Sequence, residues 1–443
     1  MRHLSLAIAL LVGTALSAQN AFLNNSFFPR YWKANTDFLI AARVRNSNAT
    51  PLISFHVDWR WNNGPVQIGN WQSTTGITGN QYWPYEHQIP FNQPASAGVL
   101  KVWVVGSGDT DPSNDTLRFT VDVIGNWVAK SVLIEQYTGT WCQFCPAANA
   151  ATNGLDVDPL IVVAKHHNMD EFTNQNSTDY WAWFNANYSP AGVMEQEEFG
   201  TLPDDAAYDQ WGARAEQRKL GVSPASISVS AAFNEWTRLL TVDVNTTMTA
   251  VVNGTFIVNA YILEDNLPGP QTNAPAGYIH HQVVREVLGG PDGTAGVIPA
   301  TTVANGSYDH QYTFTVPEQW NHNNLRVIAM VTEVRTGTLW TVNVAEAEVV
   351  AVGVEESASA EPIGLYPNPS DGPLWIHIPA NVPSHIRVFS SDGRCVIDHT
   401  FPANGGTIRL DAFADLPAGT YLVRVEAGKS IRSERVVRIP TVR

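Results

Sequence analysis

Two cysteines three residues apart are the side chains in this sequence best suited to chemistry. Cys142 and Cys145 form a Cys-x-x-Cys motif shortly after the apolar run 132–134. When such a motif follows a strand and opens a helix, the first thiol lies where helix N–H groups and the helix dipole favour a thiolate. The second thiol, one turn further on, can close a small disulfide ring. The spacing therefore predicts thiol–disulfide chemistry in which Cys142 attacks and Cys145 resolves.

Three other interpretations of the motif stay open. Half of a zinc site would need a second ligand pair, and the remaining cysteine, Cys395, is far away and has no partner. A Cys142–Cys145 bridge could instead be structural and inert. A copper site could recruit His166 from the end of the next predicted strand, although a hydrogen-bonded strand terminus is the simpler explanation for that imidazole.

The composition is typical of an exported, β-rich protein. The chain has 443 residues and a formal net charge of −15, which argues against nucleic acid as a partner. Only 15% of the residues are charged. Residues 1–18 have the basic start, apolar run and small residues of a secretory signal peptide. No later stretch is long enough to span a bilayer, so we expect no transmembrane segment.

Residues 19–126 predict an immunoglobulin-like β-sandwich. Apolar residues alternate with polar ones in the stretches 55–61, 100–104 and 117–123, as they do in strands with one buried face. Turn residues separate these stretches at the spacing of such sandwiches.

From residue 127 to residue 221 the pattern alternates between strands and helices. Strands are predicted at 132–137, 160–165 and 193–195, and helices at 144–155, 178–186 and 204–219. A right-handed crossover makes the first two strands parallel neighbours, so their carboxyl ends share one sheet edge. That edge should bring His166 and His167 near Cys142. Pro190 precedes the third strand, and a Ser-Pro peptide bond there could be cis.

The run 132–146, with its Trp-Cys-x-x-Cys-Pro sequence, resembles the thioredoxin superfamily. More narrowly, residues 127–350 are similar to the Omp28-related outer-membrane proteins of Bacteroidota, which join a thioredoxin-like domain to β-sandwich modules. The resemblance implies that Cys142 is the nucleophile and Cys145 the resolving thiol. It also implies that Pro190 is the cis-proline that faces the pair.

One position departs from the thioredoxin pattern. Thioredoxins carry a buried aspartate six residues before the first cysteine, where this chain has Gln136. Glutamine cannot relay a proton to Cys145, and strand alternation sends the neighbouring Glu135 to the opposite face. The departure puts rapid reductase turnover in doubt.

Residues 222–351 return to alternating strands and predict a second sandwich of immunoglobulin or fibronectin type. His280 and His281 are expected to cap a strand. A metal role for this pair would need a third ligand that the sequence does not identify, so we predict neither a metal site nor a cofactor.

The end of the chain reads as a linker followed by a sorting module. Residues 352–362 are small, polar and acidic, as linkers are. Within 363–443, a Tyr-Pro-Asn-Pro run at 366–369, an Asp-Gly pair and a Leu-Pro-Ala-Gly-Thr-Tyr run at 416–421 resemble the type A C-terminal sorting domain of the type IX secretion system. This implies transit through the periplasm and outer membrane with the type IX machinery as partner, then release or attachment at the cell surface.

The predicted fold class is therefore multidomain and mostly β, with one α/β domain between two sandwiches and a sorting domain at the end. One functional hypothesis is a thiol–disulfide oxidoreductase, or a redox-active binding protein, that acts on protein thiols or disulfides. The alternative is a non-catalytic surface adhesin or binding protein with an inert Cys142–Cys145 disulfide. Cys395, in the sorting module, is expected to be a small buried residue.

Overall fold

The computed structural model separates into two compact units, Met1–Ala351 and Val352–Arg443. The predicted signal peptide and nearly all of the predicted linker lie outside the described residues. Among the residues that the structure describes, no helix is both long enough and apolar enough to cross a membrane. The structure describes residues 21–440, apart from 25–26, 48–50, 78, 80, 107–114, 198–207, 336–337, 353–363, 379–382, 403–405 and 428–429.

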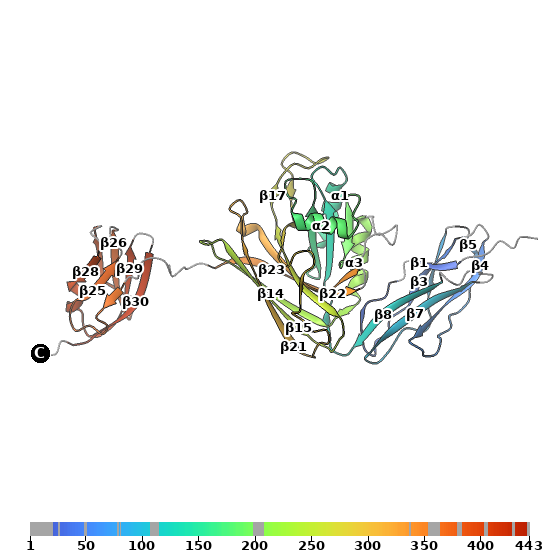
Figure 1. The fold of residues 1–443 in the computed structure, drawn as a ribbon, viewed down its shortest axis with the longest axis horizontal. Coiled ribbons are helices and arrows are strands. Elements are labelled where there is room, and N and C mark those ends of the chain that lie inside the picture. The colour runs from blue at the N-terminus through green and yellow to red at the C-terminus, as the bar shows by residue number, and fades with distance from the viewer. Residues whose placement is uncertain are drawn as a thin grey trace, which may run out of the picture. The chain divides into compact units, whose positions relative to one another are not determined.

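The N-terminal part of unit 1 is a two-sheet sandwich, as predicted. Its sheets have the strand orders β1-β3-β6 and β2-β8-β7-β4-β5 (Figure 1). The apolar positions are buried as predicted, Phe55 and Val57 on β4 and Leu100 and Val102 on β7, but on β4 the intervening His56 and Asp58 are buried as well. The strands are β1 Ala21–Asn24, β2 Tyr31–Lys33, β3 Ala41–Asn46, β4 Leu52–Trp61, β5 Gln72–Ile77, β6 Tyr82–Glu86, β7 Ser96–Gly106 and β8 Thr116–Ile124.

One continuous sheet of eleven strands runs through the rest of unit 1. Its order is β12-β10-β11-β19-β16-β22-β23-β14-β15-β21, with β20 paired to β16. The segments 127–221 and 222–351 therefore share a sheet, and the boundary between them stays a prediction. Two short pairs, β9 with β13 and β17 with β18, lie outside this sheet. All the strands of this part are β9 Val128–Ala129, β10 Val132–Thr138, β11 Ile161–His167, β12 Ala191–Met194, β13 Val222–Ser223, β14 Ala225–Phe233, β15 Leu239–Met248, β16 Thr255–Glu264, β17 Leu267–Pro268, β18 Ile279–His280, β19 Val283–Val287, β20 Thr294–Ala295, β21 Gly306–Thr315, β22 Leu325–Arg335 and β23 Thr338–Ala351.

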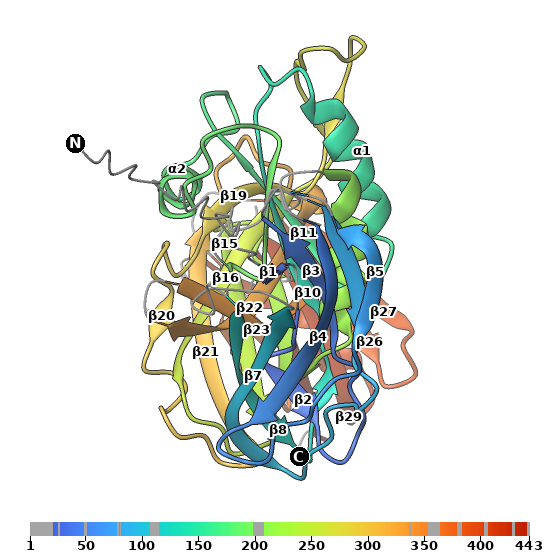
Figure 2. The same ribbon diagram turned by 90° about the vertical axis from the view of Figure 1, so that its right-hand side faces the viewer.

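Strands β10 and β11 pair in parallel, and β12 runs antiparallel to β10. Figure 2 shows α1 and α2 on opposite sides of these strands. Alternation along β10 explains this. Ile134 packs in one cluster with Leu155 of α1 and Ala215 of α3, while Leu133 packs in another with Tyr180 of α2. The helices are α1 Cys145–Leu155, α2 Gln175–Trp183 and α3 Trp211–Lys219, with 3-10 turns at Tyr208–Gln210 and His322–Asn324.

The described part of unit 2 is a small sandwich with sheets β24-β25-β28 and β27-β26-β29-β30. The expectation that Cys395 is buried is wrong. This thiol begins the edge strand β27, most of whose residues are exposed, and it is itself exposed. The elements are β24 Gly364–Tyr366, β25 Leu374–Ile378, β26 Ser384–Ser390, β27 Cys395–Phe401, β28 Gly406–Leu410, β29 Gly419–Ala427, β30 Ser430–Arg438 and a 3-10 turn at Asp411–Asp415.

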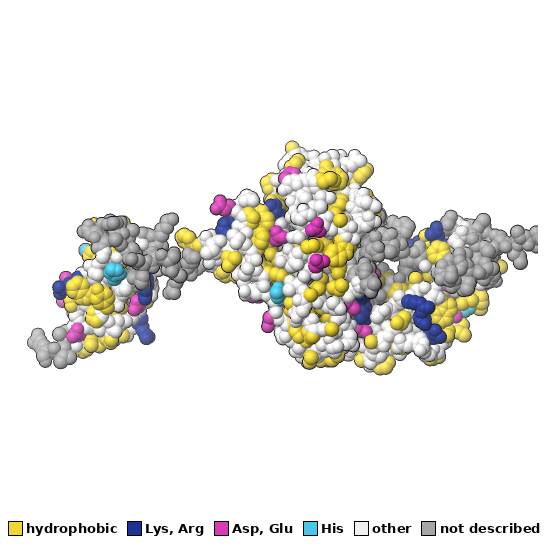
Figure 3. Space-filling model, viewed as in Figure 1, with side chains coloured by type: hydrophobic (Ala, Val, Ile, Leu, Met, Phe, Trp, Pro, Cys, Tyr) yellow, Lys and Arg dark blue, Asp and Glu magenta, His cyan; other side chains and the backbone are white. Residues whose placement is uncertain are grey.

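A buried ion pair holds the base of the α/β part together. Lys130 precedes β10 and Glu195 follows β12, and their Nζ and Oε1 atoms lie 2.6 Å apart. Trp340 Nε1 on β23 donates to the other carboxylate oxygen at 2.7 Å. Burial lowers the pKa of Lys130, and Glu195 opposes that effect by stabilising the ammonium form. Charges so far from water are tolerated because each has its counter-charge. On the face of unit 1 drawn in Figure 3, charged side chains are sparse over the large sheet, while Lys and Arg side chains gather on the N-terminal sandwich.

We expect Lys130→Met to reduce the free energy of unfolding by about 3 kcal/mol, because the buried Glu195 carboxylate then keeps only the more distant Arg218 guanidinium, at 3.7 Å, as its counter-charge. Adding Glu195→Gln should recover part of that loss. Urea unfolding followed by tryptophan fluorescence measures both. Glu216→Gln, which removes an exposed partner of Lys219, is the control and should change stability by less than about 0.5 kcal/mol. A loss for Lys130→Met no larger than that of the control would contradict the prediction.

Candidate functional site

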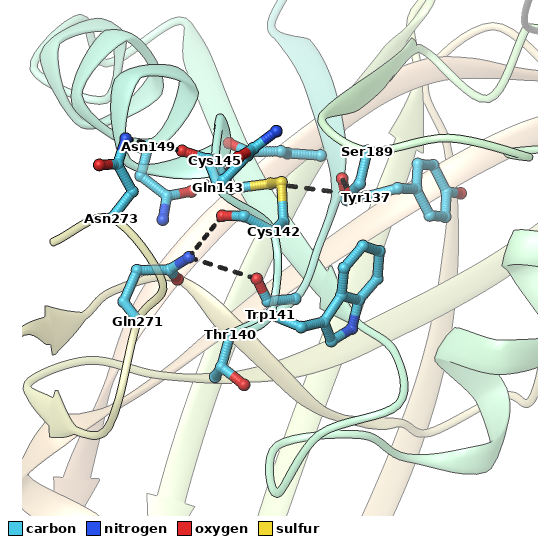
Figure 4. The surroundings of a disulfide bond; sticks show 12 residues. Tyr137, Thr140, Trp141, Cys142, Gln143, Cys145, Asn149, Ser189, Gln271 and Asn273 are labelled. Atoms are coloured by element: carbon cyan, nitrogen blue, oxygen red, sulfur yellow. Dashed lines mark hydrogen bonds between the residues drawn. A yellow bond between two sulfur atoms is a disulfide. The ribbon is translucent and has the colours of Figure 1, made fainter.

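Cys142 and Cys145 form a disulfide at the carboxyl end of β10 (Figure 4). Helix α1 begins at Cys145, with Phe144 as its N-cap and a proline in its first turn. Cys142 thus lies in the turn that leads into the helix, and the helix begins one residue later than the predicted position 144. Both cysteines are buried, with exposed fractions of 4% and 0%.

The loop before β12 lies against this disulfide. The Ser189–Pro190 peptide bond is cis, as the sequence suggested it could be. Cys145 Sγ is 3.7 Å from Ser189 Oγ, and the Ser189 hydroxyl donates to the carbonyl oxygen of Tyr137 at 2.8 Å. The structure therefore brings the three expected site residues, Cys142, Cys145 and Pro190, into one place. Their catalytic roles stay predictions.

A hairpin from the following segment covers the disulfide. We call this hairpin, Leu267–His280, the strap; it starts with β17 and ends with β18, which pair with each other. Gln271 Nε2 donates to the Cys142 carbonyl at 2.9 Å and, more weakly, to the Gly139 carbonyl at 3.4 Å. Figure 4 shows the Gln271 side chain reaching the disulfide turn in this way.

Two further strap residues hold the same turn. The backbone N–H of Thr272 donates to the Thr140 carbonyl at 2.7 Å. Asn273 Nδ2 donates to the Gln143 carbonyl at 3.1 Å. Sequence analysis missed the strap because it lies about 130 positions along the chain from the residues it contacts, and a loop composition does not say which surface the loop covers.

A neutral hydrogen-bond network lies beneath the disulfide. Gln136 is fully buried; its Nε2 donates to Asn149 Oδ1 at 2.6 Å and its Oε1 accepts from Thr152 Oγ1 at 2.8 Å. Asn149 Nδ2 in turn donates to the hydroxyl of Tyr278 on the strap at 3.0 Å. Amides and hydroxyls of this kind do not exchange protons with a thiol near neutral pH. The network therefore supports the expectation that this position cannot relay a proton to Cys145.

Lys165 is a buried ionisable residue that sequence analysis did not single out. It is the register partner of Gln136 on β11, and burial lowers its pKa to about 7. Its Nζ donates to Asn153 Oδ1 on α1 at 2.6 Å. A lysine inside an otherwise apolar predicted strand was the signal that could have identified it.

The two consecutive histidines of β11 face opposite sides of the sheet. His166 lies on the α2 side, where its ring nitrogens are 2.9 Å from Ser177 Oγ and 3.3 Å from Glu135 Oε1. Glu135 thus points away from Gln136, as alternation predicted. Both ring nitrogens of His166 face these partners, so His166 does not face the sulfur atoms. His166 is therefore not placed to bind copper together with Cys142 and Cys145.

His167 faces the strap. Its Nδ1 is 2.7 Å from Asp170 Oδ2, and its ring centroid is 5.3 Å from that of His280. Across the described residues there is no cluster of three or more His, Cys, Asp or Glu side chains arranged to hold a metal ion.

Comparisons with known proteins identify two parts of the chain. Residues 364–439 match the secretion system C-terminal sorting domain. Residues 180–355 match outer membrane protein Omp28. The sorting-domain match means that the chain is exported and handled by the type IX secretion machinery. A search of the curated proteins finds no match.

Two solved structures from Porphyromonas gingivalis are similar. HBP35 is 18% identical over 71% of this chain and 99% of its own, with a TM-score of 0.46. A domain of the outer membrane lipoprotein Omp28 is 20% identical over 30% of this chain and 92% of its own, with a TM-score of 0.21. Both TM-scores are under 0.5, so neither likeness enters the interpretation of the site.

We expect Gln136→Glu to destabilise the protein by about 2 kcal/mol or more at pH 7, because it buries a carboxylate in a network built for an amide. Burial raises the pKa of such a carboxyl above its unfolded value of about 4.3, so the loss is complete above the folded pKa and shrinks as pH falls towards 4.3. Urea unfolding at several pH values measures it. The exposed Gln217→Glu is the matched control, and equal stability of the two variants at pH 7 would contradict the prediction.

Proposed function

We propose that this chain is an exported cell-surface protein in which the Cys142–Cys145 disulfide is a structural bridge and not a catalytic thiol pair. The observation that carries the proposal is the strap, whose Gln271 and Asn273 side chains bind the turn that holds the disulfide. Thiol–disulfide exchange needs a thiolate to approach a sulfur atom in line, and buried sulfur atoms restrict that approach.

The chemistry around the sulfurs supports the same proposal. A resolving thiol must lose its proton when it attacks the mixed disulfide. Beneath Cys145 the structure offers the amides of Gln136 and Asn149 and the hydroxyl of Thr152, none of which is a base near neutral pH. Lys165, whose pKa burial lowers to about 7, lies beside Gln136 but directs its Nζ to Asn153. Burial also disfavours the charged thiolate that this attack requires, which slows turnover further.

A second candidate is the thiol–disulfide oxidoreductase that the motif predicts. Two observations favour it: the cis Ser189–Pro190 loop touches Cys145, and Trp141 and Phe144 beside the disulfide are exposed, Phe144 by 61%. Exposed aromatic side chains next to a disulfide could receive a partner polypeptide. This activity requires the strap to lift from the disulfide turn.

Insulin-reduction assays distinguish the two candidates. We expect the native protein to reduce insulin no faster than its Cys142→Ser variant. Reduction of the native disulfide by dithiothreitol should be at least about tenfold slower than in urea, because burial limits thiolate access. The double substitution Gln271→Ala with Asn273→Ala should accelerate reduction. Thr272→Ala keeps its backbone donor and should not. Insulin turnover that depends on Cys142 would establish the second candidate instead.

The surface location has its own test. We expect a chain that ends at Ala351 to stay in the periplasm, because it lacks the sorting domain but keeps the whole of unit 1. Protease accessibility on intact cells and cell fractionation measure this. Cys395→Ser, a change within the sorting domain but outside its Tyr-Pro-Asn-Pro and Leu-Pro-Ala-Gly-Thr-Tyr runs, is the control and should reach the surface. Surface exposure of the truncated chain would refute the assignment.

A further inference from the structure

Two histidines, one on β11 and one at the end of the strap, each have one ring nitrogen fixed as a hydrogen-bond donor. His167 Nδ1 faces the Asp170 carboxylate at 2.7 Å, and the same carboxylate oxygen accepts from Thr140 N at 2.8 Å. His280 Nε2 faces the carbonyl oxygen of Pro270 at 3.1 Å, and a carbonyl can only accept. In neutral imidazoles these partners assign the protons to His167 Nδ1 and His280 Nε2. The other two nitrogens, His167 Nε2 and His280 Nδ1, are left with lone pairs.

Those lone pairs belong to a cluster of buried polar atoms that lack partners. Within the described part of the chain, His167 Nε2, His280 Nδ1, Gln271 Oε1 and Thr138 Oγ1 are buried without a hydrogen-bond partner. The side chains are at least nine-tenths buried, His167 and His280 being only 1% and 2% exposed. Burying a polar atom without a partner is costly, so four such atoms close together point to a ligand-binding site.

The four residues are also neighbours. Thr138 is the register partner of His167 across the parallel strands, so both side chains lie on the same face. The rings of His167 and His280 are in contact. Gln271 directly follows Pro270, whose carbonyl oxygen is the partner of His280 Nε2. The side-chain amide nitrogen of Gln271 donates to the carbonyl oxygen of Gly139, the residue after Thr138.

The spacing of the two rings matches that of two imidazoles on one metal ion, and it is also that of an ordinary edge-to-face ring contact. Two imidazoles on a tetrahedral ion, with metal–nitrogen bonds of about 2.0 Å, have ring centroids roughly 5.2 Å apart. Here the centroids are 5.3 Å apart and the planes are inclined by 76°. The Asp170 carboxylate behind His167 Nδ1 is the outer partner that metal-bound histidines usually have.

We propose that His167 Nε2 and His280 Nδ1 bind a divalent transition-metal ion, with Gln271 Oε1 and Thr138 Oγ1 as oxygen ligands. Imidazole nitrogen is a common zinc ligand, so Zn²⁺ is the ion to test. The ion clamps the strap to the carboxyl edge of β11, because His280 and Gln271 belong to the strap while His167 and Thr138 belong to the sheet. His281, which is 36% exposed and faces Asp265, takes no part.

Zn²⁺ titration of the full-length, chelator-treated protein by calorimetry tests the site. We expect one equivalent to bind, and His280→Gln to lower the affinity at least about tenfold. His281→Gln, a change at the adjacent residue, is the matched control and should bind as the unchanged protein does. Co²⁺ in place of Zn²⁺ should give the visible absorption of a tetrahedral nitrogen and oxygen site, lost in His280→Gln.

Equal Zn²⁺ affinity for His280→Gln and His281→Gln would overturn the proposal, as would a lack of binding by the unchanged protein. The same holds if crystals grown with Zn²⁺ show only water between His167 and His280 by anomalous scattering. That measurement uses the unchanged chain, so it decides the question even if His280→Gln fails to fold. The apo variants are compared by thermal melting to separate lost ligands from lost structure.

Discussion

The strap donates hydrogen bonds to the carbonyl groups of the disulfide turn, which are costly to bury without partners. Within the turn itself, Cys142 N donates to the Gly139 oxygen at 3.0 Å and Cys145 N donates to the Cys142 oxygen at 3.4 Å. Here Gln271, Thr272 and Asn273 donate to oxygens of four turn residues, Gly139, Thr140, Cys142 and Gln143. These contacts anchor the strap beside the buried cysteines, and its Tyr278 hydroxyl accepts a hydrogen bond from Asn149 of the amide network.

Sheet topology explains why the strap lies over the disulfide. Strand β19 pairs with the outer edge of β11 in parallel, and it also pairs with β16 in the antiparallel sense. The parallel pairing joins Val283, the first residue of β19, to Lys165 near the carboxyl end of β11, so the connection from β16 to β19 lies beside that end, where sites in parallel sheets form. The strap is that connection. A parallel pairing between distant segments thus decides what covers the cysteines.

Local patterns predicted the strands and helices around the motif but not what covers them. The apolar run 132–137 with the motif behind it predicted a strand, a turn and a helix, and the structure has β10 and α1 there. Alternation also placed Glu135 and Gln136 on opposite faces correctly. Such features depend on neighbours in the sequence, so the sequence alone contains them.

Other features depended on distant contacts and were therefore missed or wrong. Cys395 was expected inside because cysteine is usually buried, but burial is decided by whether a strand is central or at an edge. The unpartnered nitrogens of His167 and His280 arise from residues more than a hundred positions apart. The adjacent histidines His280 and His281 suggested a shared role. In the structure His280 is buried, whereas His281 is partly exposed and faces Asp265.

The shared sheet limits how this protein can be cut or recombined. A fragment that ended near residue 221 would keep β10, β11 and β12 but lose β19, so the outer edge of β11 would present unpaired backbone groups to other chains. The same cut would remove the strap and uncover the disulfide. The α/β part and the strands that follow it would thus have to be expressed or grafted together, because they share one sheet.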